Sequence, residues 1–172
     1  HRGNIYASGR SGGKVKILSK ENIDINGNIL AKGIEDIGGD IVFMSEKNVK
    51  IGEKSIVDVS GQNKGGTIRS LAKVSNYTSG TLKASSKSGY GGRVDITGES
   101  VEVSNTDITA SGKRRGGKVR IGGEYLGGKL TKLDKKYEGF VSRFGNQPKL
   151  NNAKQTIVKA DTNVDVSSQT GK

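Results

Sequence analysis

The sequence predicts an all-β protein built as a parallel β-helix, a solenoid in which short strands of one coil stack on their counterparts in the next. Three observations support this prediction: a recurring glycine pair, alternation of apolar and polar residues after each pair, and a composition too polar for a thick core. Of the 172 residues, 31% are hydrophobic, 5% are aromatic and 27 are glycines. Because stacked repeats bury a continuous core with few inward residues each, this composition is compatible with folding.

The glycine pairs define the repeat. They begin at Gly12, Gly38, Gly65, Gly91 and Gly116, so successive pairs are separated by 26, 27, 26 and 25 residues. This spacing predicts five to six coils of about 26 residues each. Glycine tolerates positive φ at sharp turns, and we therefore expect positive φ at these corners.

Each coil carries three short stretches in which every second residue is apolar. The first stretch directs inward Val15/Ile17, Ile41/Phe43, Ile68/Ser70, Val94/Ile96 and Val119/Ile121. The second directs inward Ile23/Ile25, Val49/Ile51, Ala72/Val74 and Val101/Val103, and the third Ile29/Ala31, Val57/Val59, Leu82/Ala84 and Ile108/Ala110. A period of two indicates half-buried strands, which pair at about 4.8 Å with the strands above and below.

The same alternation assigns neighbouring residues to opposite faces. Ile96 is inward, so Ile96→Asp would bury an unpaired charge at a cost of several kcal/mol. Asp95 is outward, and we expect Asp95→Ala to change stability by less than about 0.5 kcal/mol.

The last coil is interrupted by an insertion, residues 124–152, within one solenoid domain spanning residues 1–172. Apolar residues in the insertion recur at helical spacing, namely Leu130, Leu133, Tyr137, Val141 and Phe144. This pattern predicts a short amphipathic helix packed on the side of the solenoid.

Composition excludes several kinds of chemistry. The absence of cysteine excludes a disulfide scaffold, thiolate zinc sites and a cysteine nucleophile. The single histidine, His1, lies at a chain end, where a catalytic triad is not expected. The sequence contains no run of 18 apolar residues, the length that a membrane-spanning helix requires. We therefore expect no catalytic residue, no metal site, no cofactor and no nucleic-acid partner.

The coils resemble the two-partner-secretion exoproteins, a family that includes filamentous haemagglutinin, and are most similar to the high-molecular-weight adhesins of Haemophilus. The segments that carry the resemblance are GGKVKI, NIDINGNI, VDVSGQNKGGT, GGRVDITGESVEVSNTDITASG and GGKVRIGGEYLGG. The resemblance implies a right-handed β-helix that an outer-membrane partner exports and that is secreted or displayed on the bacterial surface. There it would bind a host-cell glycoprotein or glycan. The secretion domain of that family is absent, so we interpret the chain as an internal fragment of a longer fibre.

Outward residues of the first strands form a candidate glycan-binding stripe. Its cations are Lys14, Lys16, Arg69, Arg93, Lys118 and Arg120, against the acidic Asp40 and Asp95, and Lys113, Arg114 and Arg115 precede its last coil. A cationic stripe attracts anionic polymers such as sialylated or sulfated glycans. The alternative is that these charges serve solubility and block unwanted strand addition.

Two further candidates lie elsewhere in the chain. The insertion combines Lys132, Lys136 and Arg143 with Tyr137 and Phe144, a mixture suited to sugar contacts, although it could simply cover the core. Asn76-Tyr77-Thr78 is an N-x-S/T sequence, and the resemblance implies glycosylation at Asn76. The alternative is a turn asparagine equivalent to Asn26 and Asn105.

Together these features predict a non-enzymatic adhesin segment that attaches to host cells, through anionic glycans in the sharpest form of the hypothesis. Two alternatives stay open. One is a non-binding stalk of a secreted exoprotein, and the other is a polysaccharide-degrading enzyme, because the β-helix fold also supports such enzymes.

Overall fold

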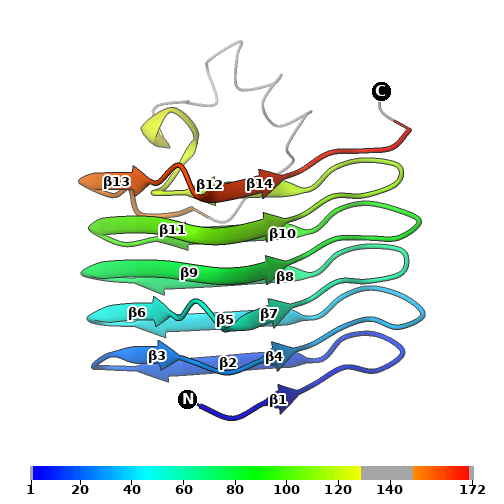
Figure 1. The fold of residues 1–172 in the computed structure, drawn as a ribbon, viewed down its shortest axis with the longest axis horizontal. Helices are drawn as coiled ribbons and strands as arrows, with labels where there is room; N and C mark the ends of the chain where they lie inside the picture. Colours follow the sequence, from blue (N-terminus) through cyan, green and yellow to red (C-terminus); the bar gives the residue numbers. More distant parts are fainter. Residues whose placement is uncertain (1, 129–148, 171–172) are drawn as a thin grey trace.

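The chain forms a parallel β-solenoid whose coils stack along one axis (Figure 1). The structure, a computed structural model, describes residues 2–128 and 149–170. Successive coils rise from the N-terminal end to the C-terminal end, and loops on one side connect each coil to the next (Figure 1). Every strand pair is parallel, which confirms the predicted fold class.

One wall of the solenoid is a five-stranded sheet with one strand from each of five successive coils. In spatial order it comprises β2 (Lys14–Ser19), β5 (Asp40–Ser45), β8 (Thr67–Ala72), β10 (Arg93–Thr97) and β12 (Lys118–Ile121). The register aligns equivalent residues of each repeat, so that Val94 lies between Ile68 and Val119. This count agrees with the five to six coils predicted from the glycine spacing.

The second and third strands of each coil form a nine-stranded sheet. It comprises β1 (Ile5–Tyr6), β3 (Ile23–Ile25), β4 (Ile29–Leu30), β6 (Asn48–Ile51), β7 (Ile56–Asp58), β9 (Ser75–Lys83), β11 (Ser100–Thr109), β13 (Gln155–Val158) and β14 (Thr162–Asp165). In the third and fourth coils the second and third strands merge into one long strand, β9 and β11 respectively. Accordingly, β9 pairs with both β6 and β7, and β11 pairs with both β13 and β14. An irregularity in the β9–β11 register lies between Val103 and Thr106, where Asn105 adopts a φ of 47°.

The core lies between the two sheets and consists of the inward residues of each strand. Residues such as Ile41, Phe43, Val94 and Ile96 are fully buried. The predicted inward pairs of the third strands are also fully buried from Ile29/Ala31 to Ile108/Ala110. Alternation alone therefore identified the core face of these strands correctly.

The second strand of the third coil differs from the prediction. Asn76 and Thr78 occupy the inward positions that Val49/Ile51 and Val101/Val103 fill in neighbouring coils. The predicted pair Ala72/Val74 is wrong, since Val74 is 46% exposed and precedes the strand. The inward positions were assigned to the wrong residues because this coil directs polar side chains into the core.

The glycine pairs are required for close packing between coils, not for positive φ. Among the described glycines, positive φ occurs at Gly80, Gly122, Gly123 and Gly127, and at none of the five pairs that define the repeat. A Cβ on Gly92 would lie 2.1 Å from the carbonyl oxygen of Gly66 in the preceding coil. A Cβ on Gly91 would lie 1.9 Å from the carbonyl oxygen of Ala110 in the following coil. The expectation of positive φ at these corners is therefore wrong.

The insertion begins with a short 3₁₀ helix, η1 (Tyr125–Gly128), beyond the end of β12. The amphipathic helix predicted around residues 130–144 lies outside the described residues. The described residues resume at Lys149, still within the insertion. Just after the insertion, the backbone N–H of Ala153 donates to the carbonyl oxygen of Gly122 (2.6 Å). The described part of the chain contains no helix long and apolar enough to cross a membrane.

Candidate anion-binding face

The register of the five-stranded sheet aligns its outward side chains into two parallel ladders. One ladder runs Lys14, Asp40, Thr67, Arg93 and Lys118, and the other runs Lys16, Val42, Arg69, Asp95 and Arg120. All six basic residues of the predicted stripe therefore lie on one face. Their environments nevertheless differ from coil to coil, and these differences decide which cations can meet a ligand.

Asp95 is outward yet fully buried, because arginines from its own coil and the next one cover it. Arg120 donates from Nε to Asp95 Oδ1 (2.8 Å) and from Nη2 to Asp95 Oδ2 (2.9 Å), a bidentate pair. Arg93 Nε lies 3.1 Å from Asp95 Oδ2 as an ion pair. The expectation that Asp95 is a dispensable surface residue is therefore wrong.

Arg120 is held on a second side by the start of the insertion. Its Nη1 lies 3.3 Å from Glu124 Oε2, and the backbone N–H of Leu150 donates to the Oε1 of the same glutamate. The Arg120 side chain is only 11% exposed. Since two carboxylates neutralise this guanidinium, Arg120 positions the surface and is poorly placed to bind an external anion.

Arg69 and Lys118 have no such carboxylate partner among the described residues. The Nε of Arg69 is buried and makes no hydrogen bond there. Burial lowers the pKa of the Lys118 ammonium from its ordinary value, and the charges of Arg115, Arg93, Lys64 and Arg120 lower that pKa further. Each of these effects disfavours the charged form, so an anion bound here would relieve the repulsion.

Arg93 lies in the same positive field. Burial is the main cause that lowers the pKa of its guanidinium, and Arg120 and Arg69 lower the pKa further while Asp95 and Asp40 oppose the change. The cations of the third, fourth and fifth coils are therefore close enough to act on one another.

The corner beside these strands adds a third ladder that the sequence interpretation did not include. Ile37, Lys64, Tyr90 and Arg115 align through successive bridges, and each immediately precedes a glycine pair. Tyr90 is 48% exposed between the two cations. The position just before each glycine pair was the signal that could have identified this ladder. An exposed ring between cations is suited to stack on a sugar while the cations bind its anionic groups.

The predicted stripe is therefore divided. Lys14 and Lys16 are exposed on the first coil, and the nearly buried Val42 separates Lys16 from Arg69 along the ladder. The cationic face proper comprises Lys64, Arg69, Tyr90, Arg93, Arg115, Lys118 and Arg120. Lys113 and Arg114 are exposed in the loop that leads to Arg115.

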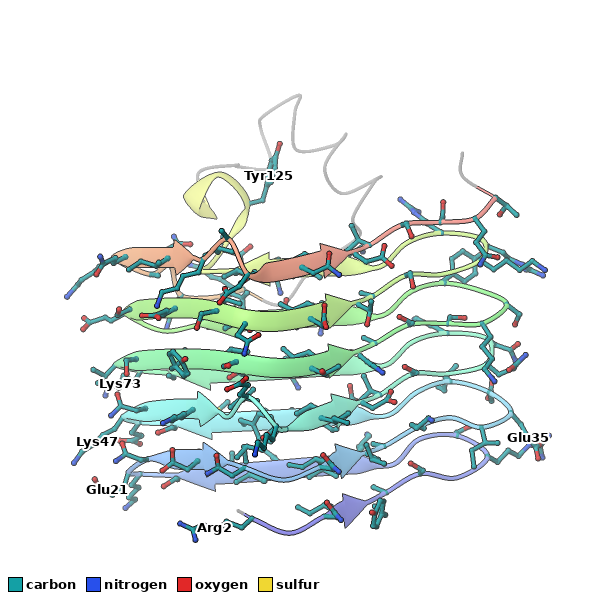
Figure 2. The ribbon with its side chains drawn as sticks, in the orientation of Figure 1. Arg2, Glu21, Glu35, Lys47, Lys73 and Tyr125 are labelled. Carbon is teal, nitrogen blue, oxygen red and sulfur yellow. The ribbon has the colours of Figure 1, made fainter. Side chains whose placement is uncertain are left out.

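Figure 2 shows the charged side chains at the two edges of the stack. Glu35 lies at the loop corner, whereas Glu21, Lys47 and Lys73 lie along the opposite edge (Figure 2). Charges of both signs occur along that opposite edge, where Lys47 Nζ forms an ion pair with Glu21 Oε2 at 2.5 Å. A carboxylate of a neighbouring coil therefore neutralises part of the positive charge at this edge.

Asn76 lies in the core within β9, so the interpretation as a turn asparagine is wrong. The side chain is 1% exposed. Its Nδ2 donates to the carbonyl oxygens of Ser70 (2.8 Å) and Thr97 (3.0 Å), and its Oδ1 accepts from the Thr78 hydroxyl (3.2 Å). The amide is neither in a turn nor accessible to a glycosylating enzyme in the folded protein.

The insertion residues Lys132, Lys136, Tyr137, Arg143 and Phe144 lie outside the described residues. Within residues 2–128 and 149–170, no three histidine, cysteine or acidic side chains converge as a metal site would require. Comparison of the chain with protein-family models, curated proteins and solved structures finds no match. The β-solenoid itself is consistent with a repeat of the filamentous-haemagglutinin kind.

Proposed function

We propose that this chain is a segment of a secreted or surface-displayed bacterial adhesin that attaches to host cells by binding anionic glycans. The binding site is the cationic face, with Arg69, Lys118, Lys64 and Arg115 as the ligand-binding cations and Tyr90 as a stacking surface. Arg93 and Arg120 position this surface through Asp95. Export through an outer-membrane partner, as the resemblance implies, belongs to the same proposal, and a cysteine-free sequence is compatible with it.

The observation that carries the proposal is the alignment of Arg69, Arg93, Lys118 and Arg120 on one wall, beside the corner ladder of Lys64, Tyr90 and Arg115. Burial, and then the charges of four of these neighbours, lower the pKa of Lys118, which agrees with that alignment. Like charges held together in a folded protein destabilise it, and a bound sulfate or carboxylate would offset that cost. A surface that served solubility alone would gain nothing from concentrating these charges around an exposed tyrosine. Carboxylates of sialic and uronic acids and sulfate esters are all ligands that arginine binds through paired N–H donors.

Two alternatives make different predictions. A stalk would bind no glycan and would hold another part of a longer fibre away from the cell. A polysaccharide-degrading enzyme needs accessible carboxylates beside its cations, whereas Asp95 is fully buried beneath two arginines. Incubation with uronic-acid polymers, followed by an assay for released ends, tests this enzymatic alternative.

A glycan array that includes sialylated, sulfated and neutral members tests the proposal. The informative variant is Arg69→Gln/Arg115→Gln/Lys118→Gln, which removes three charges and leaves the Asp95 pairs intact. The matched control is Lys54→Gln/Lys83→Gln/Lys87→Gln, at three exposed lysines outside this face. Circular dichroism and thermal melting establish that both variants fold.

We expect the chain to bind anionic glycans, and the informative variant to lose binding about tenfold relative to the control, mainly at low salt. Equal loss in both variants would mean diffuse attraction without a site. Absence of binding by the unaltered chain would contradict the proposal and favour the stalk.

A further inference from the structure

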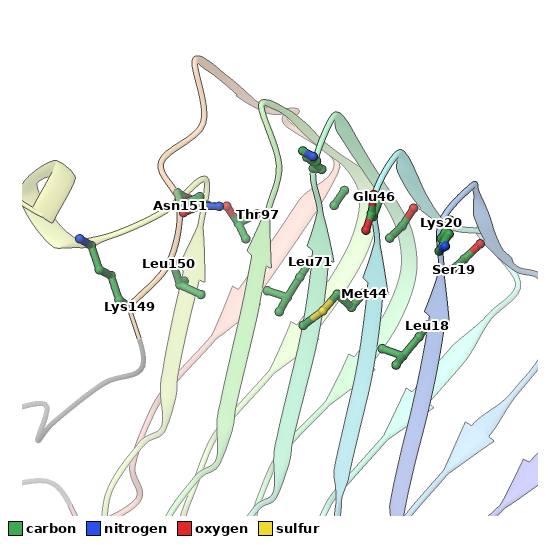
Figure 3. A pocket seen from close by; sticks show the side chains of 13 residues that line it. Leu18, Ser19, Lys20, Met44, Glu46, Leu71, Thr97, Lys149, Leu150 and Asn151 are labelled. Atoms are coloured by element: carbon green, nitrogen blue, oxygen red, sulfur yellow. The ribbon is translucent and has the colours of Figure 1, made fainter.

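An apolar ladder lies on the same outer wall of the solenoid, towards the C-terminal ends of its strands. Leu18, Met44 and Leu71 are adjacent in the register of β2, β5 and β8, and all three point outward. Leu18 is 57% exposed and Met44 45% exposed. They line a groove with a volume of about 590 Å³ (Figure 3). Contacts among the described residues do not explain three neighbouring apolar side chains outside the core, and neither does the proposed glycan site.

The chain itself shows how one end of this groove is filled. Where the ladder reaches the fourth coil, the return segment Lys149–Asn151 lies against Thr97, and the Thr97 hydroxyl donates to the carbonyl oxygen of Asn151 (2.5 Å). Leu150 is only 6% exposed there. Asn152 anchors the segment, because its Oδ1 accepts from the Glu124 backbone N–H (2.8 Å) and its Nδ2 donates to the Gly127 carbonyl oxygen (2.8 Å). The groove over Leu71, Met44 and Leu18 continues from this seated leucine (Figure 3).

The rim of the groove carries a net positive charge. Lys20, Glu46 and Lys73 occupy neighbouring coils beside the apolar ladder, and Lys149 lies at the end that Leu150 fills. Among the described residues none of these three lysines forms an ion pair. An occupant with apolar side chains and flanking carboxylates would match both features of this surface.

The spacing of the ladder fits one kind of peptide. Adjacent coils are about 4.8 Å apart, and one turn of α-helix rises about 5.4 Å. A helix laid across the strands would therefore present an apolar side chain from successive turns to Leu71, Met44 and Leu18. This is the geometry by which amphipathic helices bind apolar grooves in other proteins.

We propose that this groove docks an acidic amphipathic segment of a partner protein, an interaction separate from the glycan binding proposed above. A suitable probe is a fluorescein-labelled peptide of about fourteen leucine and glutamate residues, with leucines three and four positions apart. One sibling peptide replaces every glutamate with lysine, and another replaces every leucine with serine. Fluorescence anisotropy with the complete chain measures the affinity of each peptide.

Two pairs of variants separate the apolar and the electrostatic contributions. Leu18→Ser/Met44→Ser removes the apolar ladder, and Ile34→Ser/Ile37→Ser is the matched control, since those isoleucines are 68% and 45% exposed at a different surface. Lys20→Glu/Lys73→Glu reverses the rim, with Lys54→Glu/Lys87→Glu as its control. All four variants change exposed residues, and thermal melting verifies that each one folds.

We expect the acidic peptide to bind at least about tenfold more tightly than either sibling, and the ladder variant to lose a similar factor while its control does not. Rim reversal should weaken the acidic peptide and strengthen the lysine peptide. Equal binding of the acidic and lysine peptides, or equal loss in variant and control, would overturn the proposal. A third result would also overturn it: no peptide binds, and the chain forms a concentration-dependent dimer that the ladder variant abolishes. The groove would then be a contact between copies.

Discussion

At the scale of single residues, Asp95 demonstrates that an outward side chain is not necessarily an exposed one. Its carboxylate accepts two hydrogen bonds from Arg120 and pairs with Arg93. Removal of one partner from a buried ion pair leaves the other charges desolvated and uncompensated. Asp95 therefore stabilises the cationic face from beneath.

We predict that Asp95→Ala lowers the free energy of unfolding by about 3 kcal/mol. Asp161→Ala, at an exposed aspartate, serves as the control and should change stability by less than about 0.5 kcal/mol. Denaturant titration of both variants measures the difference. Equal midpoints would mean that the pairs of Asp95 contribute nothing to folding.

Lys118 gives a prediction with a definite sign. Its pKa is lowered in the folded state, so between that lowered pKa and the ordinary value of 10.5 the unfolded chain binds more protons than the native chain. Stability therefore receives a positive contribution as the pH rises through this window, and the charged lysine is unfavourable below it. Lys118→Gln should raise the melting temperature at neutral pH and remove this contribution at alkaline pH. Thermal melts from neutral to alkaline pH measure both effects, and a lower melting temperature for the variant would contradict them.

Asn76 replaces a core valine of the neighbouring coils with a fully hydrogen-bonded amide. Asn76→Ala would leave Ser70, Thr78 and the carbonyl oxygen of Thr97 without this partner in a buried setting. We expect a loss of about 2–3 kcal/mol, since buried polar groups that lose a partner bear the full desolvation penalty. The exposed Asn163→Ala, which removes one hydrogen bond to Asp107, is the control and should have little effect in the same unfolding assay. A stability of Asn76→Ala equal to that of the control would show that the buried network is dispensable.

At the scale of elements, the glycine pairs set the distance between coils. The second glycine of each of the last four pairs packs against the preceding coil in the same way, since a Cβ on Gly39, Gly66, Gly92 or Gly117 would lie 2.0–2.2 Å from a glycine carbonyl oxygen. These contacts are with backbone, which cannot rotate away. The repeat therefore depends on the absence of a side chain at every coil.

We predict that Gly92→Ala destabilises the solenoid by about 3 kcal/mol or more, because two coils would have to separate locally. Gly3→Ala is a matched control, since nothing lies within 4 Å of a Cβ at that position. Thermal melting followed by circular dichroism distinguishes the two. A native-like melt for Gly92→Ala would contradict the close packing of coils.

The sequence predicts this fold well because one repeat length and a period of two determine both the stack and its inward face. The predicted inward residues were wrong in the second strand of the third coil, because Asn76 and Thr78 are inward polar residues that hydrophobic alternation cannot reveal. For the site, the register of the cations followed from the repeat. The neutralisation of Arg93 and Arg120 by Asp95 did not follow from the repeat, because it depends on how side chains of two coils fold over a carboxylate.

At the scale of the whole molecule, the formal charge of +12 is unevenly distributed. Charges of both signs share the edge that carries Glu21 and Lys47, and the first coils carry Arg10 paired with Glu35. Cations concentrate instead on the wall and corner of the last three coils. A repeated fold thus presents one chemically distinct surface, and the glycan proposal depends on that surface being the place of contact.

Acetylation footprinting by mass spectrometry, with and without a sulfated or sialylated glycan, tests this point most directly. A bound anionic polymer should protect Lys64 and Lys118 of the cationic face, and Lys113 in the adjoining loop, from acetylation, since its charges would pair with their ammonium groups. Lys54, Lys83 and Lys87 should react equally in both samples, and a neutral polysaccharide should protect none of the six. Uniform protection of all six lysines, or protection of the second set alone, would contradict the assignment of glycan binding to the cationic face.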